Sequence, residues 1–123
     1  MDISTDLSAG IPVVRITGDM RLWGKQGLAD IVRETLHDLM AGGARRVILN
    51  LSGVPRIDSR GIGCLARCHA TAITSNSEIS LVLGPGFVLE TLKQLNFIRL
   101  YPIYSDEATA LAQVKAADPT SKA

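Results

Sequence analysis

The chain has 123 residues, of which 46% are hydrophobic and 20% are charged. This length supports one hydrophobic core and is too short for two ordinary domains. Lysine and arginine number 13 against 12 acidic residues, so a formal net charge of +1 gives no electrostatic basis for nucleic-acid binding.

No stretch of the sequence approaches the roughly 20 apolar residues that a membrane-spanning helix needs. Residues 1–6 also lack the basic and apolar regions of a signal peptide. We therefore expect a soluble, cytoplasmic protein without membrane insertion. We expect a monomer or a weak homodimer.

The chain begins with two predicted strands. Residues 3–7 form the first, Ala9 and Gly10 a turn, and residues 12–17, which are rich in β-branched side chains, the second. The short turn indicates that the two strands are antiparallel.

Residues 18–24 form a connection that carries an unusual amount of apolar side chain for a loop. Met20, Leu22 and Trp23 either pack under the following helix or belong to a contact surface. Aromatic side chains contribute much of the binding energy of protein interfaces. Both interpretations stay open for these residues.

From Lys25 the apolar residues recur at helical spacing. The predicted inward residues are Leu28, Ile31, Val32, Thr35, Leu36 and Leu39. The predicted solvated face carries Asp30, Arg33, Glu34, His37 and Asp38. Gly42 and Gly43 supply the left-handed conformation that ends helices.

A strongly apolar strand then leads into a turn and a second helix. Residues 47–49 are typical of a strand covered on both faces, as in parallel sheets. Gly53 and Pro55 interrupt it, and Asp58 and Ser59 can each accept hydrogen bonds from the free amides of a first helical turn. This strand-to-helix corner is the centre of the sequence pattern.

Residues 61–73 predict the second helix. Its predicted inward stripe is Ile62, Leu65, Ala66, His69 and Ile73. Cys64 and Cys68 lie four residues apart on this helix, but zinc generally needs four ligands and His69 points about 100° away from Cys68. We expect two small buried or half-buried residues here, and neither a metal nor a cofactor.

The remaining chain continues the alternation of strands and helices. Residues 78–83 predict a strand, residues 87–95 a helix, and Asn96 a left-handed residue after it. Residues 97–103 form an apolar link that adds a brief strand.

Ser105 or Asp106 caps a last predicted helix. This helix carries Ala108, Leu111, Ala112 and Val114. Residues 118–123 are expected to be a disordered tail, which leaves residues 1–117 as the domain. The pattern predicts a single α/β domain with a mixed, mostly parallel sheet of about four to five strands and about four helices.

The order of these elements resembles the STAS domain, and in particular the stand-alone bacterial anti-sigma-factor antagonists. The most specific match is Asn50-Leu51-Ser52-Gly53-Val54 leading to Ile57-Asp58-Ser59-Arg60-Gly61-Ile62-Gly63. A second match is Thr17-Gly18-Asp19-Met20 ahead of the first long helix. The resemblance covers about residues 3–116.

The resemblance implies a phosphorylation-controlled partner switch. In the family, the serine directly after the aspartate is phosphorylated by a partner that is both kinase and anti-sigma factor, which places the phosphorylation site on Ser59. The unphosphorylated antagonist binds the anti-sigma factor and frees sigma, and a phosphatase resets the phosphorylated form. The antagonist itself is not an enzyme. The implied partner contacts are Asp58, Ser59, Arg60, Gly61, Arg56, Met20, Arg21 and Trp23.

Two arginines depart from the family pattern. The family commonly has an aspartate at the position of Arg21 and a modest side chain at Arg60. With Arg56 and Arg67, these arginines either gather around the corner or form solvated surface. The sharper hypothesis is that Arg21 or Arg60 pairs with phosphoserine and weakens the repulsion that ejects the partner.

Ser59 also has a structural explanation, as a helix cap worth about 1 kcal/mol. The two roles are compatible, because a phosphate placed there meets the positive end of a helix. Asp58 is either the cap itself or a residue that orients the serine. Gly61 and Gly63 lack the spacing and lysine of a nucleotide-binding loop, so tight backbone packing explains them better.

A hydrolase triad of Ser59, His69 and Asp58 is excluded because Ser59 and His69 lie roughly 15 Å apart along the helix axis. The alternative is a STAS subunit of a stress-sensing scaffold or of a lipid-transport complex, acting as a structural or regulatory binding module.

Overall fold

The structure is a computed structural model that describes residues 2–18 and 28–117. Its strands are β1 (Asp2–Ser8), β2 (Ile11–Thr17), β3 (Arg46–Gly53), β4 (Glu78–Val82) and β5 (Ile103–Tyr104). Its helices are α2 (Leu28–Ala41), α3 (Ser59–Thr74), α4 (Phe87–Gln94), the 3-10 helix η2 (Phe97–Arg99) and α5 (Glu107–Ala117). The predicted element order is confirmed. The predicted tail at residues 118–123 and the predicted helix start at residues 25–27 lie outside the described residues.

The five strands form one sheet in the order β1-β2-β3-β4-β5. β1 pairs with β2 in antiparallel fashion, and the β2–β3, β3–β4 and β4–β5 pairs are parallel. The prediction of a mixed, mostly parallel sheet after an antiparallel start is therefore confirmed. In this arrangement the carboxyl ends of β2, β3, β4 and β5 share one edge of the sheet.

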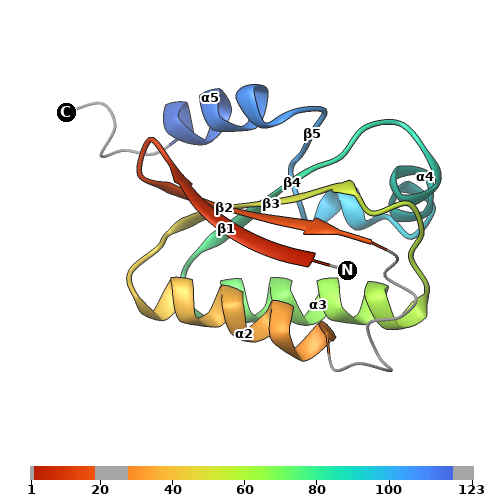
Figure 1. Cartoon of the computed structure of the whole chain (residues 1–123), viewed down its shortest axis with the longest axis horizontal. Coiled ribbons are helices and arrows are strands. Elements are labelled where there is room, and N and C mark those ends of the chain that lie inside the picture. The colour runs from red at the N-terminus through yellow and green to blue at the C-terminus, as the bar shows by residue number, and fades with distance from the viewer. Residues whose placement is uncertain (1, 19–27, 118–123) are drawn as a thin grey trace.

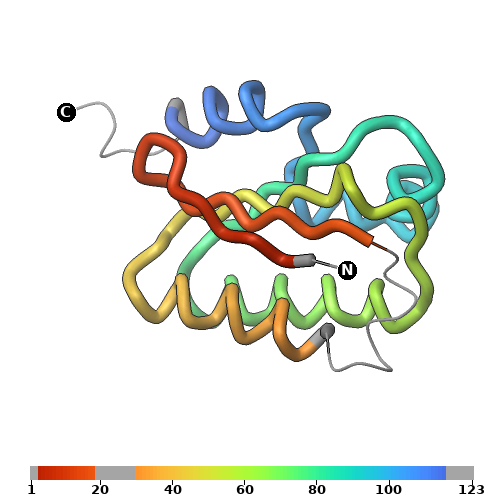
Figure 2. The backbone as a smooth tube through the Cα atoms, in the orientation of Figure 1, coloured from red at the N-terminus to blue at the C-terminus, as the bar shows by residue number. Residues whose placement is uncertain are grey.

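The helices form layers on both faces of the sheet. α2 and α3 lie side by side against one face, and α5 lies across the other (Figure 1). The tube in Figure 2 shows the same layering, with α4 at the end where β3 runs out into α3. The two faces of β3 explain its apolar run: Val47 and Leu49 pack in the core under α2 and α3, while Ile48 packs with Ala110 and Val114 of α5.

The inward face of α3 differs from the prediction. Its buried residues are Gly61, Cys64, Leu65, Cys68 and Ala72. Of the predicted stripe, Ala66 and Ile73 are exposed, and Ile62 and His69 are half-buried. Sequence reasoning favoured the larger apolar side chains, whereas the real face consists mostly of small residues that let α3 pack closely against its neighbours.

The other helices show smaller corrections of the same kind. In α2, Val32, Leu36 and Met40 are buried, whereas Ile31 is 46% exposed although it was predicted to point inward. In α5 the buried residues are Ala110 and Val114, and the predicted Ala108 and Ala112 are exposed. A spacing of four residues places the buried side chains on one line along each of these helices.

The predicted helix ends agree with the backbone conformation. Gly43, after α2, has φ 105°, and Asn96, after α4, has φ 63°. Both lie in the left-handed region that glycine and asparagine tolerate. The helix α3 begins two residues earlier than predicted, at Ser59. Among the helices of residues 28–117, none combines the length and apolar character needed to cross a membrane.

Candidate functional site at the end of strand β3

The corner between β3 and α3 is fixed to the core by two apolar side chains. Val54 and Ile57 are each 5% exposed, and the Val54 amide donates a hydrogen bond to the Leu51 carbonyl at 2.9 Å. Pro55 and Arg56 lie between the two anchors and are exposed. The corner is therefore a short, anchored loop that presents its middle residues to solvent.

Glycine at position 53 allows β2 to approach the corner closely. The Gly18 amide donates to the Gly53 carbonyl at 3.0 Å. A β-carbon on Gly53 would lie 2.7 Å from Cγ2 of Thr17 and 3.3 Å from the Ile16 carbonyl oxygen. The end of β2 therefore lies beside the corner. Met20, Arg21 and Trp23, three of the predicted contact residues, lie outside the described residues.

Asp58 is the cap of α3. It has an extended backbone, with φ −121° and ψ −171°, and its Oδ1 accepts hydrogen bonds from the amides of Arg60 at 3.0 Å and Gly61 at 3.2 Å. Ser59 is therefore the first residue of the helix, and the interpretation of Ser59 as the cap is wrong. The aspartate satisfies the free amides that the serine was expected to satisfy.

Ser59 is exposed at the positive end of the α3 dipole. Within residues 2–18 and 28–117, its hydroxyl takes part in no hydrogen bond. The first turn of the helix contains no acidic residue. The hydroxyl is thus accessible, and it stands where a negative charge is stabilised by a helix terminus.

The predicted arginines of the corner are exposed. Arg56, Arg60 and Arg67 form no ion pair with any side chain that the structure describes. Arg56 and Arg60 flank Ser59 in sequence, whereas Arg67 lies about 12 Å from it along the helix, at 1.5 Å per residue. Two of the three arginines therefore belong to the corner, and Arg67 does not.

The two glycines after Ser59 differ in their surroundings. Gly61 is buried. A β-carbon on Gly63 would meet no described atom within 4 Å. Tight backbone packing, which was predicted for both, therefore does not explain Gly63.

The cysteines of α3, Cys64 and Cys68, are buried, as predicted, and form no disulfide. A hydrogen bond with Cys64, together with burial, raises the pKa of the Cys68 thiol. His69 packs edge-on against Tyr101 with ring centroids 5.5 Å apart. It lies about 15 Å from Ser59 along the helix, at 1.5 Å per residue. In the described part of the chain, no group of three His, Cys, Asp or Glu side chains is placed to hold a metal ion.

A polar network on the other face of the sheet was missed by sequence reasoning. Arg15 donates from Nε to Oε2 of Glu107 at 2.7 Å and from Nη2 to Oε1 at 2.8 Å. Asn50 donates to the same carboxylate, and its Oδ1 accepts from the Ser52 amide at 2.8 Å. The Arg15 hydrogen bond holds the pKa of Glu107 below its usual value. The network ties α5 to β2 and to the last residues of β3.

One signal in the sequence pointed to this network. Asn50 is a polar residue between the apolar Leu49 and Leu51, within the most specific part of the motif. A buried or half-buried amide needs hydrogen-bond partners. Its partner, however, lies 57 residues away on α5, and only the fold brings the two together.

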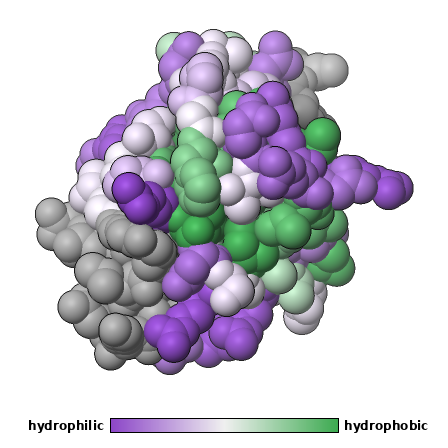
Figure 3. Space-filling view, turned by 90° about the vertical axis from the view of Figure 1, so that its right-hand side faces the viewer, coloured by the Kyte–Doolittle hydropathy of each residue, from purple (hydrophilic) through white to green (hydrophobic). Residues whose placement is uncertain are grey.

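An apolar groove lies at the same edge of the sheet as the corner. It has a volume of about 450 Å³ and runs between α4, η2 and β5, with Leu83, Pro85, Leu89, Ile98 and Ile103 in its lining. Figure 3 shows apolar side chains gathered on this face of the molecule. Phe87 and Ile98 are 60% and 50% exposed. In open α/β sheets, the carboxyl edge of the strands is the usual place for binding sites.

Comparison with known protein families agrees with this fold. The STAS domain family model matches residues 2–110. Comparison with curated proteins finds no match.

Solved structures share the fold at low identity. An anti-sigma factor antagonist from Mycobacterium paratuberculosis has a TM-score of 0.78 and 17% identity over 93% of each chain. The anti-sigma factor antagonist SpoIIAA in its unphosphorylated form has a TM-score of 0.74 and 13% identity over 95% of this chain and 99% of that one. The phosphorylated form of Bacillus SpoIIAA has a TM-score of 0.69 and 15% identity over 92% and 99%. The family match extends over most of the sequence, and the chain belongs to the STAS domain family.

Proposed function

We propose that this protein is an anti-sigma-factor antagonist whose partner binding is controlled by phosphorylation of Ser59. The observation that carries the proposal is the separation of roles at the corner: Asp58 caps α3, and the exposed Ser59 hydroxyl takes part in no hydrogen bond with the described residues. A kinase partner needs such a hydroxyl. The unphosphorylated protein binds an anti-sigma factor with serine kinase activity, and a phosphatase resets the phosphorylated form.

The position of Ser59 explains how a phosphate changes binding. Phosphorylation adds about −1.5 to −2 charges at pH 7. The helix terminus stabilises the phosphate within the protein, so the fold tolerates the modification. The partner surface that packs on the corner must instead desolvate this charge or face repulsion, and the complex dissociates.

The proposed contact surface is centred on the corner. It consists of Asp58, Ser59, Arg60, Gly61 and Arg56, joined by Met20, Arg21 and Trp23. The apolar groove beside α4 extends this surface along the same edge of the sheet. A surface with an apolar part and a charged rim is typical of a regulated protein interface.

The likeness to solved antagonists supports this proposal. SpoIIAA, an anti-sigma factor antagonist, is among the similar structures in both its unphosphorylated and its phosphorylated form. We accordingly propose a binding module that performs no catalysis and acts in the cytoplasm on transcription.

A pulldown from the native cells, with and without ATP, tests the proposal. We expect the wild type to retain a kinase-like anti-sigma factor, and mass spectrometry to find phosphate on Ser59 after ATP addition. Ser59→Ala retains the partner with ATP, and Ser59→Asp does not bind it. Ser75→Ala is the matched control, because Ser75 is an exposed serine at the other end of the same helix. An unmodified Ser59 in a complex with transport or scaffold subunits would contradict the proposal and support the alternative function.

A further inference from the structure

A second groove lies at the opposite edge of the sheet from Ser59. Its volume is about 900 Å³. It is formed by the last turns of α3, the loop before β4, the first residues of β3 and β4, and the segment after η2. Its lining includes Arg45, Arg46, His69, Ile73, Asn76 and Leu100. Small-molecule sites typically have volumes of about 300 to 1,000 Å³ and a few polar groups on apolar walls.

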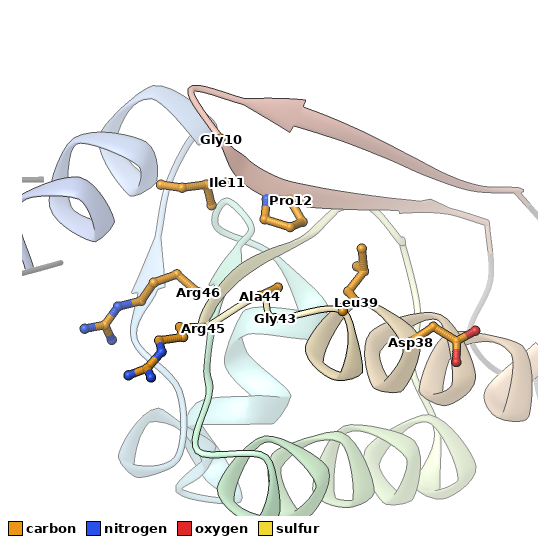
Figure 4. Close-up of a pocket in the computed structure, with 10 residues that line it drawn as sticks. Gly10, Ile11, Pro12, Asp38, Leu39, Gly43, Ala44, Arg45 and Arg46 are labelled. Atoms are coloured by element: carbon orange, nitrogen blue, oxygen red, sulfur yellow. The ribbon is translucent and has the colours of Figure 1, made fainter. Parts of the chain in front are cut away.

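One wall of this groove is positively charged. Arg45 is exposed and forms no ion pair with the described residues. Arg46 forms an ion pair with Glu78, the one carboxylate in the lining. Figure 4, which shows a neighbouring pocket that shares both arginines, shows their side chains extending in the same direction and away from Asp38. The lining therefore contains two guanidinium groups and one carboxylate.

The other wall is apolar and open to solvent. Ile73 is 66% exposed and Leu100 is 38% exposed. Ile73 was predicted to be a core residue of α3, and packing within the described chain does not account for it. A large aliphatic side chain exposed at the edge of a cavity marks a place where an apolar ligand group removes surface from water.

We infer that this groove binds a small amphiphilic anion, with its carboxylate or phosphate group on Arg45 and Arg46 and its apolar body on Ile73 and Leu100. Asn76 also lines the groove, and its side-chain amide adds a hydrogen-bond donor for the anion. The Ser77 hydroxyl donates to the Ala44 carbonyl at 2.9 Å and is not part of the proposed site. Arginine suits this task because its planar guanidinium group makes paired hydrogen bonds to carboxylate and phosphate oxygens.

This site is separate from the corner. Ile73 and Ser59 are at opposite ends of α3, about 21 Å apart at 1.5 Å per residue. A ligand in the groove and a protein partner on the corner can therefore be bound together, and the inference does not depend on the proposed function.

Calorimetric titration with four probes tests the inference, with the two amphiphilic anions kept below their critical micelle concentrations. The probes are octyl phosphate, octanoate, inorganic phosphate and octan-1-ol. We expect at least one of the two amphiphilic anions to bind about tenfold or more tightly than both inorganic phosphate and octan-1-ol, since a charged contact and an apolar contact each contribute. Whether octyl phosphate or octanoate binds better distinguishes a phosphate ligand from a carboxylate one.

Variants locate the binding. Arg45→Ala and Ile73→Asp should each weaken binding of the better anion about tenfold. Arg67→Ala on α3 and Leu7→Asp on β1 are matched controls, because both residues are exposed outside this groove, and neither should change the affinity. Ser59→Ala should also bind normally, which separates this test from that of the proposed function.

Three results would overturn the inference. The first is no binding of either amphiphilic anion to the folded wild type, verified by its circular dichroism spectrum. The second is equal binding of inorganic phosphate or octan-1-ol. The third is an unchanged affinity in both Arg45→Ala and Ile73→Asp.

Discussion

The Asp58 carboxylate caps the helix that Ser59 begins. It accepts hydrogen bonds from the Arg60 and Gly61 amides at 3.0 and 3.2 Å, and the adjacent Ser59 hydroxyl is exposed. Two neighbouring residues that both suit a helix cap therefore have different roles. One stabilises the helix, and the other is available for modification.

The first prediction is that removing the Asp58 carboxylate and removing the Ser59 hydroxyl affect the free energy of unfolding differently. Asp58→Ala should lower the free energy of unfolding by about 1 kcal/mol, because it leaves amides of the first turn without their acceptor. Ser59→Ala should change it by less than about 0.5 kcal/mol, as for an exposed surface substitution. Urea denaturation measures both. A loss for Ser59→Ala as large as that for Asp58→Ala would show that the serine hydroxyl has a structural role after all.

The second prediction concerns the two glycines with opposite surroundings. Gly53→Ala should destabilise the fold by about 1 to 3 kcal/mol, because the new methyl group meets the stiff, β-branched Thr17. Gly63→Ala should stabilise the fold by about 0.5 to 1 kcal/mol, because alanine is the better helix former and a β-carbon meets no described neighbour within 4 Å. The thermal denaturation midpoint should therefore fall in Gly53→Ala and rise in Gly63→Ala, relative to the wild type. Destabilisation of both variants would contradict the account of Gly63.

The third prediction concerns pH and the network around Glu107. Its folded-state pKa is lowered, first by the Arg15 hydrogen bond. The ionised carboxylate therefore contributes stability above its unfolded pKa of about 4.3, and this contribution is lost as pH falls toward the lower folded value. Glu107→Gln should cost about 1 to 2 kcal/mol at pH 7, and this cost should shrink as the pH is lowered.

Urea denaturation of both proteins at pH 7 and at about pH 3.5 checks this prediction around the unfolded pKa. The pKa of Asp106 is also lowered, by a hydrogen bond from the Thr109 amide, but Asp106 is present in both proteins and its effect cancels. Glu34→Gln, at an exposed position on α2, is the control for removal of a carboxylate. A difference between wild type and Glu107→Gln that is independent of pH would contradict the proposed origin of the stability.

The fold was largely predictable because its strands and turns carry strong local signals. Residues 47–49 are all apolar because the strand is covered on both faces. Gly43 and Asn96 end helices through their left-handed backbone. The helix faces were less predictable. Cys64, Cys68 and Ala72 are buried on α3 while the larger Ile73 is exposed, and no rule of hydrophobicity gives that order without knowledge of the neighbouring surfaces.

The candidate site was predictable in its position and less so in its details. Sequence alone placed Asp58 and Ser59 at the start of a helix, but two residues with similar capping ability could not be ranked without the backbone geometry. The partner of Asn50 could not be found, because Glu107 is 57 residues away. Contacts between distant elements depend on the fold, and local sequence carries no record of them.

The fourth prediction concerns the arginine beside the proposed phosphorylation site. Arg60 is exposed and pairs with no described carboxylate, so it can pair with a phosphate on Ser59 and reduce the repulsion of the partner. The loss of partner affinity between Ser59 and phospho-Ser59 should become larger, by about twofold to tenfold, in Arg60→Ala. Arg67→Ala, farther along the same helix, is the control. An identical loss of affinity in wild type and Arg60→Ala would show that Arg60 does not contribute.

The most direct test is the affinity of the proposed anti-sigma partner for this protein before and after stoichiometric phosphorylation of Ser59, measured by calorimetry. The account predicts tight binding of the unphosphorylated protein and a loss of about 100-fold or more after phosphorylation, corresponding to about 2.7 kcal/mol. When the partner itself phosphorylates Ser59 in the mixture, the complex should dissociate. Equal affinity of the two forms, with phosphate verified on Ser59 by mass spectrometry, would contradict the partner switch.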